Sequence, residues 1–131
     1  MATSTKKTTK KVAAPKKAEA AVLKGATAEL SGYPQSPRKV RLVTDLIKGK
    51  KLPEAFIALS FLPKRAALPI KKLIESAAAS AAAKGDDITQ LRVKSITVDN
   101  GGVMVRYMPR AMGRATPIRR RRSLVRVILA A

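Results

Sequence analysis

Between residues 36 and 84 the apolar residues recur at helical spacing in three segments. The first begins at Ser36-Pro37, a pair typical of a helix start, and runs through Lys48 to Gly49, a typical helix stop. Apolar residues three and four positions apart predict one buried stripe along this helix. The stripe holds Val40, Val43 and Ile47, with Leu46 beside them.

Two more helices are expected before residue 85. One starts at Leu52-Pro53, places Phe56, Leu59 and Leu62 at regular spacing, and ends at Pro63. The next spans residues 64–84, and the proline at position 69 either kinks it or delays its regular part. Its apolar face is expected to hold Ala67, Ile70, Ile74, Ala77 or Ala78, and Ala81.

Strand-like periodicity appears on both sides of these helices. Residues 26–30 predict a short strand that the segment 31–34 should break. From Leu91 a period of two begins, and its phase shifts before Ile96, which predicts a bulge near Ser95. Candidate hairpin turns lie at residues 99–102 and 109–117, and residues 124–129 form a returning strand. One strand, three helices and then further strands indicate an α+β fold.

Composition and charge narrow the class of protein. The 131 residues carry 28 basic and 8 acidic side chains, a formal net charge of +20, which favours a polyanionic partner. The length and the apolar fraction of 46% suffice for one small domain. Cysteine and histidine are absent, so we expect no disulfide, metal site or cofactor. Residues 1–24 are rich in Lys, Ala and Thr with one acid, which predicts a disordered basic tail.

The stretch of residues 106–126 carries eight arginines and no acid. Buried guanidinium groups would need paired anions, so the stretch must face solvent or a polyanion. Methionine and tyrosine side chains among the arginines offer adaptable contacts to unstacked bases, unless they pack on the protein's own core. The planar guanidinium of arginine also forms bidentate hydrogen bonds to phosphate. The stretch therefore predicts recognition of folded RNA at short range.

The start of the first expected helix is basic as well. Arg38, Lys39 and Arg41 stand in the first turn, where the helix dipole disfavours cations. A phosphate group would compensate, because the free N–H groups of a helix start also bind anions.

Catalytic motifs are missing, and we therefore expect no enzymatic activity. No phosphate-binding loop of the GxxxxGK[ST] type occurs, and Asp86-Asp87, the one adjacent pair of acids, is typical of a loop. Two classes compete with RNA binding. A DNA-compacting protein would fit the Lys/Ala/Pro tail, whereas a membrane-surface protein would need an amphipathic helix with bulky apolar residues in place of the alanine face. No apolar run is long enough to span a bilayer.

Four motifs occur in an order that resembles a known family. They are SPRKVRLVTDLIKGKKLPEA at residues 36–55, ESAAASA at 75–81, VDNGG at 98–102 and MPRAMGRA at 108–115. Together they resemble the large-subunit ribosomal proteins numbered twenty-two, in their bacterial form, over residues 26–129. One departure is Met112, which stands where that family usually has lysine or arginine.

The resemblance implies a fold and a domain organisation. A globule of three helices on a three-stranded antiparallel sheet should lie outside the large subunit, with a long β-hairpin reaching through rRNA to the nascent-peptide exit tunnel. Residues 1–24 would be the tail and 25–131 a single domain, with the globule at 25–98 plus 120–131 and the hairpin at 99–119. Residues 99–102 then become a bend or bulge within an arm, and the turn moves to 109–116.

The resemblance also implies partners and sites. The partners are large-subunit rRNA, neighbouring large-subunit proteins and the nascent polypeptide, in the cytoplasmic ribosome of a bacterium, with a supporting role in subunit assembly and no membrane or small-molecule substrate. The expected RNA-binding residues are Ser36, Arg38, Lys39, Arg41, Arg106, Arg110, Arg114, Arg119, Arg120, Arg121 and Arg122. The expected tunnel tip is Met108, Pro109, Arg110, Ala111, Met112, Gly113, Arg114 and Ala115.

Overall fold

The computed structural model describes residues 25–130, so the tail expected at residues 1–24 lies outside the described part of the chain. The elements follow the order of one strand, three helices and two long strands. They are β1 Ala26–Tyr33, α1 Pro37–Ile47, α2 Leu52–Phe61, α3 Ala67–Ala82, β2 Arg92–Pro109 and β3 Ala115–Ala130, with a short 3-10 turn, η1 Ala111–Gly113, between the last two. The expected α+β class is confirmed.

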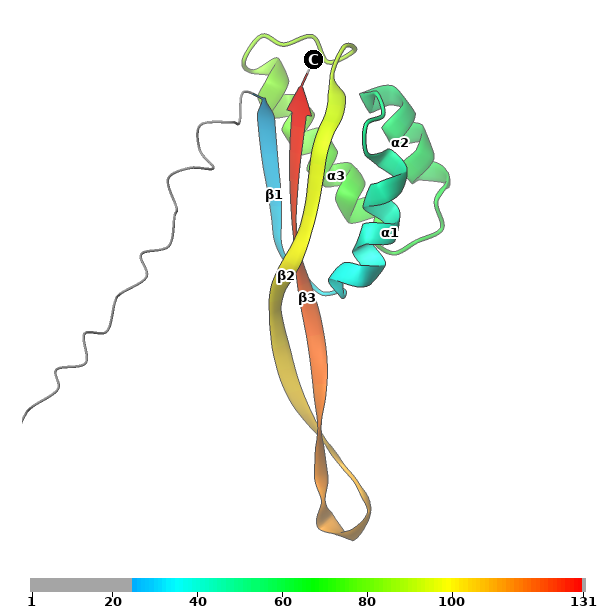
Figure 1. Ribbon diagram of the computed structural model, residues 1–131, viewed down its shortest axis with the longest axis vertical. Helices are drawn as coiled ribbons and strands as arrows, with labels where there is room; N and C mark the ends of the chain where they lie inside the picture. The colour runs from blue at the N-terminus through cyan, green and yellow to red at the C-terminus, as the bar shows by residue number, and fades with distance from the viewer. Residues whose placement is uncertain (1–24, 131) are drawn as a thin grey trace, which may run out of the picture.

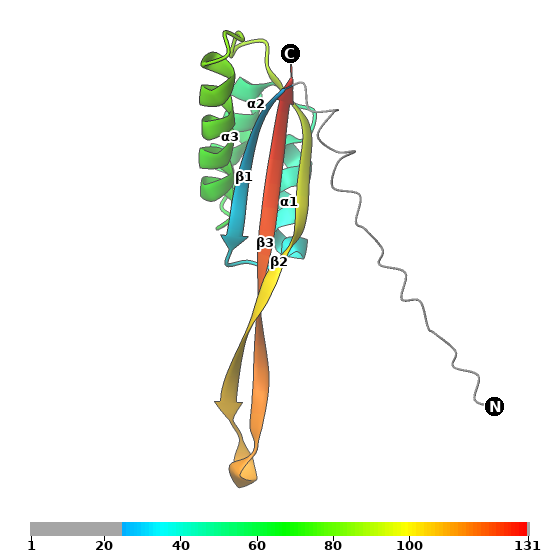
Figure 2. The ribbon, with the colours of Figure 1, turned by 90° about the vertical axis from the view of Figure 1, so that its left-hand side faces the viewer.

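The last strand of the chain is the central strand of the sheet. The three strands are antiparallel in the order β1-β3-β2. The helices cover one face, with α3 packed on β1 and β3 and α1 packed mainly on β2 (Figures 1 and 2). Beyond the helices β2 and β3 continue together as a long hairpin (Figure 1). Three helices on a three-stranded sheet are the predicted arrangement, which is confirmed.

The core forms where the alternating strand residues meet the helical faces. On β3, Val125, Val127 and Leu129 are fully buried at every second position, as a strand with one covered face requires. Pro69 stands in the first turn of α3, where its missing N–H is tolerated, so it delays the helix and does not kink it. Every residue predicted for the α3 face is buried, namely Ala67, Ile70, Ile74, Ala77, Ala78 and Ala81.

The predicted faces of the two shorter helices need correction. On α1 the stripe is buried as predicted, but Leu46, at its edge, is 50% exposed. On α2 the fully buried residues are Leu52, Ala55 and Leu59, and the predicted Phe56 and Leu62 are only partly buried. The α2 sequence is apolar on nearly all sides, so its spacing alone could not select the buried face.

β1 is longer than its sequence pattern predicts. The strand was expected to end at Leu30, yet pairing with β3 resumes at Tyr33 after a one-residue shift in register. Gly32 adopts a φ of +65°, which glycine reaches without steric cost. The segment expected to break the strand therefore forms a bulge within it.

β2 contains two bulges against β3. The first inserts Lys94, one residue from the predicted position at Ser95. The second inserts one extra residue at Gly101-Gly102. Residues 99–102 thus contain a bulge within β2, one of the two strands of the hairpin, as the resemblance implied. Their interpretation as a hairpin turn is wrong.

The bulges of β1 and β2 flank the same residue of the central strand. Ser123 pairs with Tyr33 on one side and with Asn100 on the other, and its side chain is fully buried. Bulges bend strands and increase their twist, so this level marks where β2 and β3 leave the covered sheet. Below it they form a two-stranded ladder of residues 103–109 and 115–121, here called the arm.

Within residues 25–130 no helix is long and apolar enough to cross a membrane. The same residues contain no group of three acidic side chains placed to hold a metal ion.

Candidate RNA interface

Each arginine in the body of the arm stands opposite an apolar residue. The pairs are Val103–Arg121, Met104–Arg120, Val105–Arg119 and Arg106–Ile118. Directly opposed like charges would destabilise a ladder, and this register avoids them. Opposed residues share a face and successive pairs alternate, so both faces of the arm present arginine beside apolar side chains.

The apolar side chains of the arm and its tip do not pack on the core. Met104 is 40% exposed, Tyr107 74% and Met108 46%. The alternative that these side chains belong to the protein's own core is therefore excluded. They remain available for contact with another molecule.

The base of the arm is fixed by contacts that require glycine and arginine. A Cβ on Gly101 would lie 2.8 Å from the carbonyl carbon of Ser123, too close for any side chain without a backbone shift. Gly102 has a φ of +101°, which L residues rarely adopt. Arg41 of α1 donates from Nε and Nη2 to the carbonyl oxygen of Val98, at 3.2 and 2.7 Å. These bonds tie α1 to β2 just before the bulge and so help set the direction of the arm.

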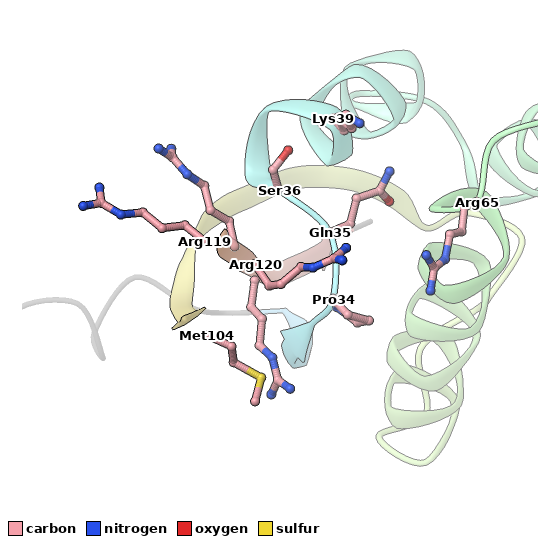
Figure 3. A pocket seen from close by; sticks show the side chains of 10 residues that line it. Pro34, Gln35, Ser36, Lys39, Arg65, Met104, Arg119 and Arg120 are labelled. Atoms are coloured by element: carbon pink, nitrogen blue, oxygen red, sulfur yellow. The ribbon is translucent and has the colours of Figure 1, made fainter. Parts of the chain in front are cut away.

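A hollow of about 690 Å³ lies where the base of the arm meets the start of α1 (Figure 3). Its cations come from three segments: Lys39 of α1, Arg65 between α2 and α3, and the four arginines 119–122 of β3. No acidic residue lines it. We call it the basic hollow. Such a concentration of one charge sign around an open concave surface favours a polyanion.

Uncharged polar groups lie among these cations. In Figure 3, Gln35 and Ser36 stand between Arg119 on one side and Arg65 on the other. Gln35 Oε1 is buried and has no hydrogen-bond partner in the described part of the chain, and the Ser36 side chain does not cap α1. An unpaired buried acceptor costs about 1–3 kcal/mol.

The tip of the hairpin is a five-residue loop at positions 110–114. The last strand pair is Pro109–Ala115, and the Arg110 N–H donates to the Arg114 carbonyl oxygen at 2.7 Å. Met112 and Gly113 both adopt positive φ, +58° and +68°, and the Met112 side chain is 93% exposed. The turn therefore lies within residues 109–116, as the resemblance implied.

The structure gathers some of the predicted RNA-binding residues and separates others. Those that line the basic hollow are Ser36, Lys39, Arg119, Arg120, Arg121 and Arg122. Arg38 is exposed on α1, Arg106 is exposed on the arm, and Arg110 and Arg114 lie at the tip. Arg41 is also exposed, but two of its donors are engaged by Val98.

Four residues that line the basic hollow are not among the predicted RNA-binding residues: Pro34, Gln35, Arg65 and Met104. The expected third helix included Arg65, but α3 begins at Ala67, so Lys64-Arg65 belongs to a connection. The Tyr33 hydroxyl donates to the Arg65 carbonyl oxygen at 3.2 Å, which holds this connection beside the end of β1. The usable signal was a pair of cations directly after Pro63, a residue that ends helices.

Comparison with known proteins gives independent information. Residues 28–130 match the family described as Ribosomal protein L22p/L17e. A relative named Large ribosomal subunit protein uL22 from Pelobacter propionicus is 48% identical over 104 residues, 79% of this chain and 94% of that protein. Relatives of the same name from Geobacter sulfurreducens and Myxococcus xanthus are each 47% identical, over 106 and 107 residues. These cover 80% and 79% of this chain, and 96% and 94% of those proteins.

The matched region includes α1, both sides of the basic hollow, the arm and the tip. The match covers well over half of the chain, and the relatives are matched over nearly their whole length. This chain therefore belongs to the ribosomal protein L22p/L17e family.

Proposed function

We propose that this chain is a structural, non-enzymatic constituent of the large ribosomal subunit that binds large-subunit rRNA. The observation that carries the proposal is the convergence of six cations from three segments on the basic hollow, with no acid among them. The family match and the name shared by the relatives support the same function. The alternative of a DNA-compacting protein gains no support from them.

Binding would begin with long-range electrostatic attraction to rRNA and would continue with short-range contacts of the basic hollow and the arm. The net charge of +20 draws the chain to rRNA, and each phosphate it neutralises releases counterions. The basic hollow then holds a turn of the RNA backbone between α1 and the base of the arm. Because the arm carries arginines on both faces, it can lie between two RNA segments and contact each of them.

The tip serves a different purpose in this proposal. Residues 108–115 carry only two charges, Arg110 and Arg114, and lie at the end of the hairpin farthest from the helices (Figure 1). A sparsely charged surface suits a passage through which a growing peptide must slide. We infer that the tip lines the nascent-peptide exit tunnel of a bacterial ribosome, while the globule stays outside and supports assembly.

Removing two cations from the basic hollow tests the rRNA contact. Arg119→Ala combined with Arg120→Ala should weaken binding of large-subunit rRNA and lower the slope of log affinity against log salt by about two units. Filter binding across a salt series measures this slope. The matched control, Arg92→Ala with Lys94→Ala, removes the same charge from the opposite end of β2 and should change the slope less.

An unchanged slope in the Arg119/Arg120 variant, or an equal change in both variants, would contradict phosphate contact at the basic hollow. Duplex DNA serves as the competitor in the same assay at physiological salt. Equal affinity for DNA and rRNA would favour the DNA-compacting alternative.

A further inference from the structure

A second depression borders the basic hollow and has a different character. This apolar groove, of about 370 Å³, lies between α1 and the connection from α2 to α3. Leu42 and Leu46 of α1 form one wall, and Leu62 contributes from the other side. Leu42 is 68% exposed and Leu46 50%. Single exposed leucines are ordinary on a protein surface, but leucines that converge on one groove mark a contact site.

The rim of the apolar groove is cationic. Lys39, Lys64 and Arg65 line its edge, and no acidic residue does. Lys39 and Arg65 also line the basic hollow, so the two depressions share a border. A molecule seated in the groove would therefore lie next to the proposed RNA contact.

Charge and surface chemistry decide among the possible occupants. RNA bases stack on aromatic rings or guanidinium planes, whereas the walls of the groove are leucine and its guanidinium, that of Arg65, stands at the rim. A second copy of this chain would bring another net charge of +20 to a cationic rim. The chain's own residues 1–24 hold seven lysines and one acid, so the rim would repel them too. An apolar side chain with a nearby carboxylate matches both the walls and the rim.

We propose that the apolar groove docks a segment of a neighbouring large-subunit protein. An apolar side chain of that segment lies between Leu42, Leu46 and Leu62, and an adjacent carboxylate meets the Lys64 amine. This inference rests on the proposed place of the chain in the large subunit. It adds to that function a protein-binding surface beside the rRNA-binding one.

Zero-length cross-linking tests the docking. A carbodiimide joins a lysine amine to a carboxylate in direct contact, so purified large subunits that contain this chain are treated with it and digested for mass spectrometry. We expect an amide between Lys64 and an Asp or Glu of another large-subunit protein. Leu42→Gln with Leu46→Gln should lower the yield about tenfold or more, because two apolar anchors are lost. Both leucines are exposed, so this variant should still fold.

The matched control is Ile57→Gln with Phe61→Gln, which changes two exposed apolar residues outside the groove and should leave the yield unchanged. An amide from Lys64 to a carboxylate of this same chain, or no amide at Lys64, would overturn the docking proposal. So would cross-linking of Lys64 to rRNA by ultraviolet light in place of the amide. Cosedimentation of the chain with large subunits after a high-salt wash is checked first, and its failure would count against the proposed function itself.

Discussion

β2 and β3 pass through two environments while they keep one hydrogen-bonded ladder. Beside the helices, every second residue of the ladder is buried, and Val98, Val125 and Val127 are at most 5% exposed. In the arm the same two strands continue, yet none of the paired residues 103–109 and 115–121 is buried. The change occurs at the level of Ser123, where both neighbouring strands bulge.

Strand propensity does not explain this difference, because β-branched residues occur in both halves. Val103 and Val105 alternate along the arm as Ile96 and Val98 do in the sheet. What the arm lacks is a third strand and a helical cover, and a two-stranded ladder alone is marginal in water. The ladder therefore fixes the geometry of the arm, and rRNA is expected to supply the cover that helices supply elsewhere.

Amide exchange of the free, full-length protein should show the largest difference between the arm and the helix-covered part of the β2–β3 ladder. Opening free energies within one protein range from near zero to the global value. We expect amides of residues 103–119 to exchange almost without protection and those of residues 124–129 to be protected up to global unfolding. Hydrogen–deuterium exchange followed by mass spectrometry measures both. Protected amides at Tyr107 and Arg119 without RNA would show that the arm is stable alone and would break the comparison.

Truncating one side chain in each half of the ladder should give unequal losses of stability. Leu129 is fully buried, so Leu129→Ala should lower the free energy of unfolding by about 2–5 kcal/mol. Val105 is 47% exposed, and Val105→Ala should change it by less than about 0.5 kcal/mol. Urea denaturation followed by circular dichroism compares them. Similar losses would mean that the arm shares the cooperative unit of the globule.

The helices and strands whose apolar residues repeat at one clear spacing could be predicted from the sequence. Every residue predicted for the α3 face is buried, because lysine, serine and glutamate mark the other side of that helix, but the prediction left out the buried Leu73. The α2 face was not predicted correctly, because that helix is apolar on nearly every side. The Ser31-Gly32 segment was misjudged for another reason: a glycine with positive φ serves a bulge as well as a strand end.

Most cations of the candidate site could be predicted from the sequence, but their convergence on the basic hollow could not. The arginine run and the basic start of α1 were visible in the sequence, whereas their meeting in one hollow depends on β3 passing beside α1. Arg65 joins them only because the α2–α3 connection lies next to Tyr33, a contact 32 positions apart in the chain. The sequence also could not separate Arg38 from Arg41, since both stand near the start of one helix.

A comparison of Arg41 with Arg38 separates two roles of an arginine, positioning the arm and binding RNA. Arg41 bonds the Val98 carbonyl oxygen with two of its five N–H donors, which leaves three for phosphate. Arg41→Ala should therefore lower the free energy of unfolding by about 1 kcal/mol and also reduce the salt slope of rRNA binding by about one unit.

Arg38→Ala serves as the matched control for Arg41→Ala, because Arg38 is exposed three residues earlier on the same helix. This variant should reduce the salt slope similarly while changing stability by less than about 0.5 kcal/mol. Urea denaturation and filter binding of both variants give the two quantities. If Arg41→Ala altered only stability, its guanidinium would act solely in joining α1 to the base of the arm. If it altered only the slope, the bonds to Val98 would contribute no net stability.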